Sequence, residues 1–168
     1  MTVMFAYALY KQGFAKEGYE VINSINKLAL DTQKSKIYPC LPEYFNAEGR
    51  GMYSYLTGSA SWFMLTLLTQ GFGIRGEYGD FLIEPKLVTA QFKIKNTIGI
   101  VSNFADRRIE VKFMNPAKKN FGSYSISRII FNGKIIAENL KQARFLITRR
   151  NFLSLSRDNI NLIEVNLD

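Results

Sequence analysis

The sequence predicts an α+β protein, with helices in its first half and an antiparallel β-sandwich in its second half. Three observations predict this division. Apolar residues recur at helical spacing up to about residue 75, and they alternate with polar residues from about residue 92 onward. An Asn-Gly pair between two apolar runs then indicates a hairpin. Gly76 and Gly79 mark the change of pattern, so we expect one domain over residues 1–76 and a second over residues 77–168.

The first half contains three predicted helices. Thr2–Gln12 is a run of helix-forming residues that ends before Gly13, and Lys16–Leu30 carries apolar residues along one face. The third helix, Gly58–Gln70, has almost no polar face, so we expect it to be buried on most sides. Three helices are too few to bury such a helix. Residues 1–76 are therefore expected to be the end of a larger helical structure whose earlier helices this chain lacks.

Asp31–Leu56, between the second and third helices, has no sustained period. It combines two prolines and two glycines with several aromatic residues, which indicates a long irregular loop. Loops of this length inside compact domains are usually functional, so this segment is a candidate binding region.

The second half alternates with a period of two. Alternation is seen around Phe92 and Ile94, in Ile109–Phe113 and in Ile163–Leu167. Asn132-Gly133, between two apolar runs, predicts a two-residue hairpin turn. We expect roughly six to eight short strands here, a number typical of an antiparallel sandwich.

The composition excludes several kinds of chemistry within this chain. With no histidine and one cysteine, Cys40, it offers no His-based catalytic triad, no zinc site and no internal disulfide. We expect no metal and no cofactor. The lack of disulfides is typical of a cytoplasmic protein. The most apolar stretch, Ala60–Leu68, is too short to span a bilayer, so we expect no membrane partner.

The net charge of +8 comes mostly from the second half, where basic and acidic residues are mixed. The basic pairs Arg107-Arg108, Lys118-Lys119 and Arg149-Arg150 are separate from one another. A nucleic-acid surface needs a continuous stripe of cations with interleaved aromatic residues. Scattered surface charge is the simpler interpretation, and nucleic acid is not an expected partner.

The start of the third helix is the first candidate site. A helix that begins at Thr57 or Gly58 has backbone N–H groups without intrahelical partners, and its dipole favours an anion there. Gly58 allows close approach to the backbone, while Thr57 and Ser59 offer hydroxyl groups. Thr57, Gly58 and Ser59 are therefore candidate phosphate-binding residues. The alternative is simple N-capping by Thr57 or Ser59.

The loop before this helix is the second candidate site. Glu43, Tyr44, Glu48 and Arg50 combine an aromatic ring with charged groups, which suits a sugar subsite where the ring stacks on the sugar and the charges bind hydroxyl groups. The loop can equally be a packed, tyrosine-rich segment with solvated charges. Glu43 and Glu48 could also form a glycosidase pair, whose separation would determine inverting or retaining chemistry.

Three stretches in order resemble one family. These are Glu48–Trp62 (EGRGMYSYLTGSASW), Phe72–Arg75 (FGIR) and Leu82–Pro85 (LIEP). They resemble the C-terminal region of the inverting β-glycoside phosphorylases, glycoside hydrolase family 94, which include the cellobiose, cellodextrin, laminaribiose and chitobiose phosphorylases and the phosphorylase-like part of cyclic β-1,2-glucan synthases. The resemblance covers most of residues 1–115, and its most specific part is the block from Tyr55 to Trp62.

The resemblance implies that residues 1–76 are the last helices of an (α/α)6 catalytic barrel and that residues 77–168 are the C-terminal β-domain. It also implies cleavage of a β-linked glucosyl di- or oligosaccharide by inorganic phosphate, with inversion, to give a sugar 1-phosphate. Thr57 and Gly58 match the family's phosphate site. The family's catalytic Asp and phosphate-binding His have no counterpart here, so no catalytic residue is assigned in this chain, and Asp31 and Asp80 are expected at the surface or in turns.

The partners implied by the resemblance are the sugar substrate, phosphate and the missing N-terminal part of the same enzyme, and the parent enzyme can be a homodimer. The isolated chain is expected to be inactive and poorly soluble. Two other functions remain open: a non-catalytic carbohydrate-binding or structural fragment and, on charge alone, a nucleic-acid-binding β-domain. Coding sequence upstream for barrel helices and an Asp-bearing loop would separate them.

Overall fold

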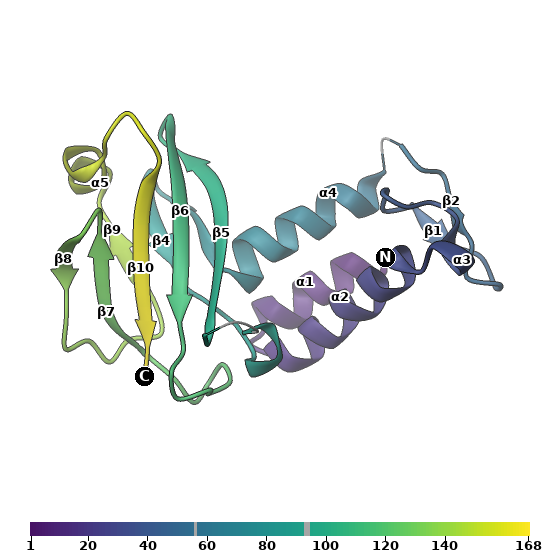
Figure 1. Ribbon diagram of the computed structural model, residues 1–168, viewed down its shortest axis with the longest axis horizontal. Coiled ribbons are helices and arrows are strands. Elements are labelled where there is room, and N and C mark those ends of the chain that lie inside the picture. The colour runs from purple at the N-terminus through teal and green to yellow at the C-terminus, as the bar shows by residue number, and fades with distance from the viewer. Residues whose placement is uncertain (56, 93–94) are drawn as a thin grey trace. The chain divides into compact units, whose positions relative to one another are not determined.

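A computed structural model describes residues 1–55, 57–92 and 95–168 (Figure 1). The chain divides into two compact units, Met1–Gly71 and Phe72–Asp168. The first unit is mainly helical and the second mainly β-sheet, which confirms the α+β class. The division lies a few residues before the boundary that the sequence predicts at residue 76, because Ile74–Glu77 is a strand paired with Asp80–Ile83 in the second unit.

The first unit contains α1 (Thr2–Lys11), α2 (Ala15–Leu30) and α4 (Gly58–Leu65), and α4 continues into a π-helix over Thr66–Gly71. The predicted helix ranges agree with these bounds to within one or two residues. Helices α1 and α2 pack closely because Gly18 of α2 lies under the ring of Tyr10. A Cβ at Gly18 would be 2.7 Å from Cδ2 of Tyr10, which is itself fully buried.

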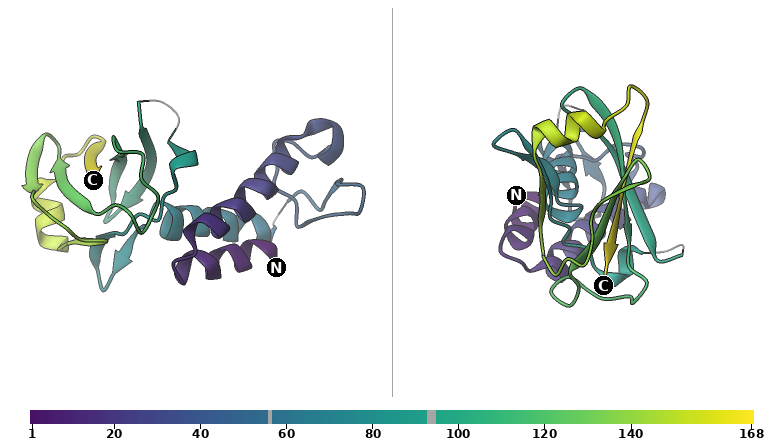
Figure 2. Two further views of the ribbon diagram at one scale, coloured as in Figure 1. Left: turned by 90° about the horizontal axis from the view of Figure 1, so that it is seen from below. Right: turned by 90° about the vertical axis from the view of Figure 1, so that its left-hand side faces the viewer.

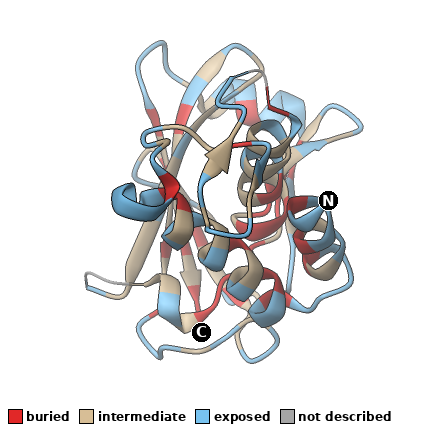
Figure 3. Cartoon of the chain, turned by 90° about the vertical axis from the view of Figure 1, so that its right-hand side faces the viewer, coloured by how far each residue is buried: buried red, intermediate tan, exposed pale blue. Residues whose placement is uncertain are grey.

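Helix α4 is less buried than its sequence predicts. None of its residues is buried, and Met64 and Leu65 are 61% and 42% exposed. Its contacts include an edge-to-face pair between Trp62 and Tyr7 of α1, with the ring centroids 5.4 Å apart. The helices in Figure 3 are red, meaning buried, on part of their surface only. Burial on most sides is therefore not seen among the described residues, and this exposure agrees with the expectation that three helices are too few to bury α4.

The segment between α2 and α4 is irregular, as predicted, but it contains short ordered elements. Asp31 caps α3 (Thr32–Ser35) by accepting hydrogen bonds from the N–H groups of Gln33 and Lys34. Two short strands follow, β1 (Tyr44–Phe45) and β2 (Gly51–Met52), which pair antiparallel. Side-chain caps and a hairpin therefore order a segment that has no periodic pattern.

The second unit has eight strands among its described residues, within the predicted number. A three-stranded sheet has the order β3 (Ile74–Glu77), β4 (Asp80–Ile83), β9 (Phe145–Ile147). A five-stranded sheet has the order β5 (Thr97–Phe104), β6 (Arg107–Met114), β10 (Asn161–Leu167), β7 (Ile126–Phe131), β8 (Lys134–Ala137). Two short helices accompany them, a 3-10 turn at Thr89–Gln91 and α5 at Arg149–Leu155.

Alternating burial confirms two of the predicted strands. Every second residue of β10 is fully buried, and Ile109, Val111 and Phe113 are the buried positions of β6. The predicted Asn132-Gly133 turn joins β7 to β8, and both residues have positive φ (50° and 81°), as a type I′ turn requires. The predicted alternation around Phe92 and Ile94 falls partly on residues 93–94, which lie outside the described residues.

The five-stranded sheet is mixed, which corrects the prediction that all strands are antiparallel. Strand β10 pairs antiparallel with β7 but parallel with β6, with Ile163 opposite Val111 (Figure 1). The reason is topological. The last strand of the chain inserts between β6 and β7, and alternation within a strand carries no information about its neighbours' direction.

Both sheets share an aromatic core. Phe81 of β4 lies 4.9 Å from Phe104 of β5 and 5.4 Å from Phe152 of α5, measured between ring centroids. Phe152 also contacts Phe131 of β7 at 5.5 Å. Helix α5 lies at one end of the two sheets (Figures 1 and 2) and inserts Phe152, which is fully buried, between them.

Candidate functional site

Thr57 is the N-cap of α4. Its hydroxyl oxygen accepts a hydrogen bond from the N–H of Ala60 at 3.1 Å, and the hydroxyl donates to the carbonyl of Leu41 at 3.2 Å. The residue is only 7% exposed. The Thr57 hydroxyl thus both accepts and donates a hydrogen bond within the fold, as the alternative of simple N-capping predicts.

The carboxylate of Glu43 lies at the same helix start. Its Oε2 accepts a hydrogen bond from the N–H of Ser59 at 3.2 Å, and the Ser59 hydroxyl donates to the Glu43 carbonyl at 2.8 Å. A Cβ built on Gly58 would be 3.9 Å from both carboxylate oxygens. The predicted preference of this helix start for an anion is thus met by a side chain of the protein itself.

A depression of about 660 Å³ adjoins this helix start and brings three predicted residues together: Glu43, Tyr44 and Ser59. Apolar side chains of α1 and α2, among them Val3 and Ile25, form much of its remaining wall. An apolar wall with a few convergent polar groups is the usual composition of a small-molecule site.

The other two predicted sugar-binding residues lie at the turn of the β1–β2 hairpin. Asn46 closes this turn by accepting a hydrogen bond from the Arg50 N–H at 2.9 Å, and Glu48 is exposed within it. Glu43 is at the open end of the hairpin. Glu43 and Glu48 thus belong to opposite ends of one short hairpin.

Arg50 lines a separate depression of about 320 Å³, together with Lys36, Tyr53 and Tyr55. Sequence reasoning did not identify Lys36 as a site residue. The proximity of Lys36 to Arg50 depends on Gly51. A Cβ at Gly51 would be 2.7 Å from Cγ2 of Ile37, so the hairpin lies against the segment after α3. The glycines on both sides of Arg50 were the available sequence signal.

The other two stretches that carry the family resemblance come together in the second unit. A Cβ at Gly73 would be 1.8 Å from the carbonyl oxygen of Glu84, and Arg75 forms an ion pair with Glu84 at 2.5 Å. Lys86 follows and is 8% exposed. Burial lowers the pKa of Lys86, while Glu84 acts in the opposite direction. The close approach of Gly73 to Glu84 and the Arg75–Glu84 ion pair thus join β3 to the segment that follows β4.

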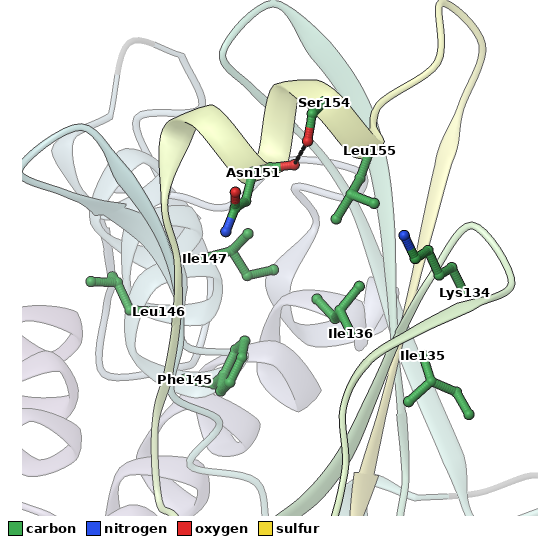
Figure 4. Close-up of a pocket in the computed structure, with 9 residues that line it drawn as sticks. All are labelled: Lys134, Ile135, Ile136, Phe145, Leu146, Ile147, Asn151, Ser154 and Leu155. Atoms are coloured by element: carbon green, nitrogen blue, oxygen red, sulfur yellow. Dashed lines mark hydrogen bonds between the residues drawn. The ribbon is translucent and has the colours of Figure 1, made fainter.

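A third depression, of about 350 Å³, lies between β8, β9 and α5 (Figure 4). Ile136, Phe145 and Ile147 give it an apolar interior, with Lys134 and Asn151 as polar lining residues. No residue predicted as functional lines it. Asp80, expected at the surface or in a turn, begins β4 and accepts a hydrogen bond from the Arg149 N–H at 2.7 Å.

The sequence matches no protein-family model and no curated protein. Within residues 1–55, 57–92 and 95–168, no helix has the length and apolar character needed to cross a membrane. The same residues contain no group of three or more Cys, Asp or Glu side chains placed to hold a metal ion.

Proposed function

We propose that this chain is the C-terminal segment of a cytoplasmic, inverting β-glycoside phosphorylase, which cleaves a β-linked glucosyl di- or oligosaccharide with inorganic phosphate. In this proposal the first unit is the end of the family's (α/α)6 barrel and the second unit is its C-terminal β-sandwich. The general acid comes from a preceding segment of the same enzyme. The proposal rests on the resemblance of residues 48–62, 72–75 and 82–85 to that family.

One structural observation supports it most. The most specific part of the resemblance, Tyr55–Trp62, contains the start of α4, and that start already holds an anionic group, the Glu43 carboxylate. It adjoins a depression large enough for a sugar. An anion site beside a sugar-sized depression is what a phosphorolytic reaction needs, since phosphate must attack the anomeric carbon directly.

Phosphate binding at this site involves a displacement. The Gly58 backbone is open to approach, because a Cβ there would meet only the Glu43 carboxylate at 3.9 Å. Phosphate would take the N–H groups of Gly58 and Ser59 after Glu43 moves aside, while Thr57 holds the helix start in place through its own hydrogen bonds. Fixed N–H groups at a helix start stabilise an anion without reorganisation during the reaction.

The alternative is a non-catalytic carbohydrate-binding or structural fragment. It is favoured by the same geometry, because Glu43 and Thr57 already accept the N–H groups of Ser59 and Ala60 at the helix start. In this alternative the carboxylate is a permanent cap, and the depression holds a sugar without phosphate.

The test uses the polypeptide that the complete reading frame encodes, incubated with cellobiose or laminaribiose and with or without phosphate. The expected result is phosphate-dependent release of α-glucose 1-phosphate, observed by ³¹P NMR, with none from the 168-residue chain alone. General acid–base catalysis is commonly worth about 10²- to 10⁴-fold in rate, and the chain has no counterpart of the family's general acid or histidine. Glucose release that does not depend on phosphate, or binding without turnover, would favour the alternative.

A further inference from the structure

Three cations gather on one side of the first unit. Lys34 and Lys36 belong to α3 and its C-cap, and Arg50 follows the hairpin turn. Two glycines bring the hairpin to this place. A Cβ at Gly49 would be 3.9 Å from Cβ of Lys34, and one at Gly51 would be 2.7 Å from Ile37. The backbone on both sides of Arg50 therefore lies against the segment that carries the two lysines.

These cations have no acidic partner among the described residues. All ion pairs within 4.0 Å that involve described residues lie in the second unit. Asp31, the nearest acid in sequence to the two lysines, uses its carboxylate to cap α3. Like charges held on one surface repel each other, and an anionic ligand removes that cost.

Two exposed aromatic rings accompany the cations. Lys36 and Arg50 line the same depression, of about 320 Å³, with Tyr53 and Tyr55, and no acidic side chain is among its described lining residues. Tyr53 is 69% exposed and Tyr55 79% exposed, so both tyrosines are largely accessible to a ligand. Exposed tyrosine rings next to unpaired cations suit a ligand that has both a stacking face and a negative charge.

We propose that this depression binds a sugar that carries an anionic group, a phosphate or a carboxylate. The tyrosine rings stack on the pyranose, while Lys36 and Arg50 bind the anion. Arg50 presents a planar guanidinium that suits bidentate contact with either group. The role of this site in catalysis rests on the proposed function. In a phosphorylase, the site would select an anionic sugar as the leaving or accepting partner of the glucosyl group.

Calorimetric titration of the 168-residue chain tests this, with glucose 6-phosphate, glucuronate, glucose and inorganic phosphate as separate ligands. We expect both anionic sugars to bind more tightly than glucose, and more weakly as salt rises. Glucose 6-phosphate binding above that of glucuronate and inorganic phosphate identifies a sugar phosphate; the reverse order of the two sugars identifies a sugar acid. Arg50→Gln and Lys36→Gln should each weaken this binding by about tenfold. Lys16→Gln, which removes one charge from an exposed position on α2, should not.

Three results would overturn the inference. These are equal binding of glucose and both anionic sugars, equal effects of Lys36→Gln and Lys16→Gln, and tighter binding of a single-stranded oligonucleotide than of any sugar. Circular dichroism of each variant shows whether it remains folded. The two proposals can fail separately. If anionic sugars do not bind, the enzyme can still phosphorolyse neutral sugars, and if there is no phosphorolysis, this depression can still bind anionic sugars.

Discussion

Replacing Glu43 with glutamine tests whether the start of α4 is an anion site. In the wild-type chain the Glu43 carboxylate accepts the Ser59 N–H at 3.2 Å and lies 3.9 Å from the position of a Cβ on Gly58. A phosphate bound to these N–H groups must either displace the carboxylate or lie next to it. Glutamine keeps the acceptor oxygen and the side-chain size but removes the charge that competes with phosphate.

The magnitude follows from Coulomb's law. Two unit charges about 4 Å apart in a water-like medium repel by about 1 kcal/mol, and phosphate at neutral pH carries between one and two charges. We therefore expect Glu43→Gln to strengthen phosphate binding by about 1–2 kcal/mol, or roughly 5- to 30-fold. Its cost to stability should be small, about 0.3–1 kcal/mol, the value of one charge near an exposed helix start.

The assay is calorimetric titration of the 168-residue chain with inorganic phosphate at constant ionic strength. Glu48→Gln is the matched control, since it makes the same change of charge at the hairpin turn. Two results would contradict the expected gain in affinity: equal phosphate binding by the two variants, or weaker binding by Glu43→Gln than by the wild type. Either result means that phosphate does not use the start of α4 and that Glu43 is a permanent cap.

Three further changes test the fold. Gly73→Ala should destabilise the chain by at least about 2 kcal/mol in urea unfolding, because its Cβ would overlap the Glu84 carbonyl. Gly79→Ala, at φ +90° with open space around it, should cost only about 1–2 kcal/mol, and similar costs for the two variants would show that packing at Gly73 is not the cause. Asn132→Ala removes side-chain hydrogen bonds to two backbone groups and one amide, so unfolding should become easier by about 2–3 kcal/mol, and no change would contradict their role. Burial, with a smaller effect of the neighbouring Tyr19, raises the pKa of Tyr10. Above about pH 10 this tyrosine therefore ionises in the unfolded chain before it does in the folded chain, and the free energy of unfolding falls as pH rises. Tyr10→Phe should flatten this fall, and an unchanged slope would show that another group causes it.

The candidate site could be predicted only in part. The helix start at Thr57 was evident from its residue types, and its preference for an anion followed from unpaired N–H groups. That Glu43, sixteen positions before Ser59, supplies the anion was not evident. Lys36 was missed for a related reason, since its proximity to Arg50 depends on how the β1–β2 hairpin folds back.

The sequence by itself determined the local elements of this protein. Helix ranges followed from apolar spacing, buried strand positions from alternation, and the turn at Asn132-Gly133 from two residues that accept positive φ. These features depend on interactions between residues a few positions apart. Only the tertiary structure decided that β10 lies between β6 and β7, parallel to one and antiparallel to the other, and which residues of α4 remain exposed. Strand order, helix burial and capping across a loop depend on contacts between segments far apart in the chain, for which a local pattern contains no information.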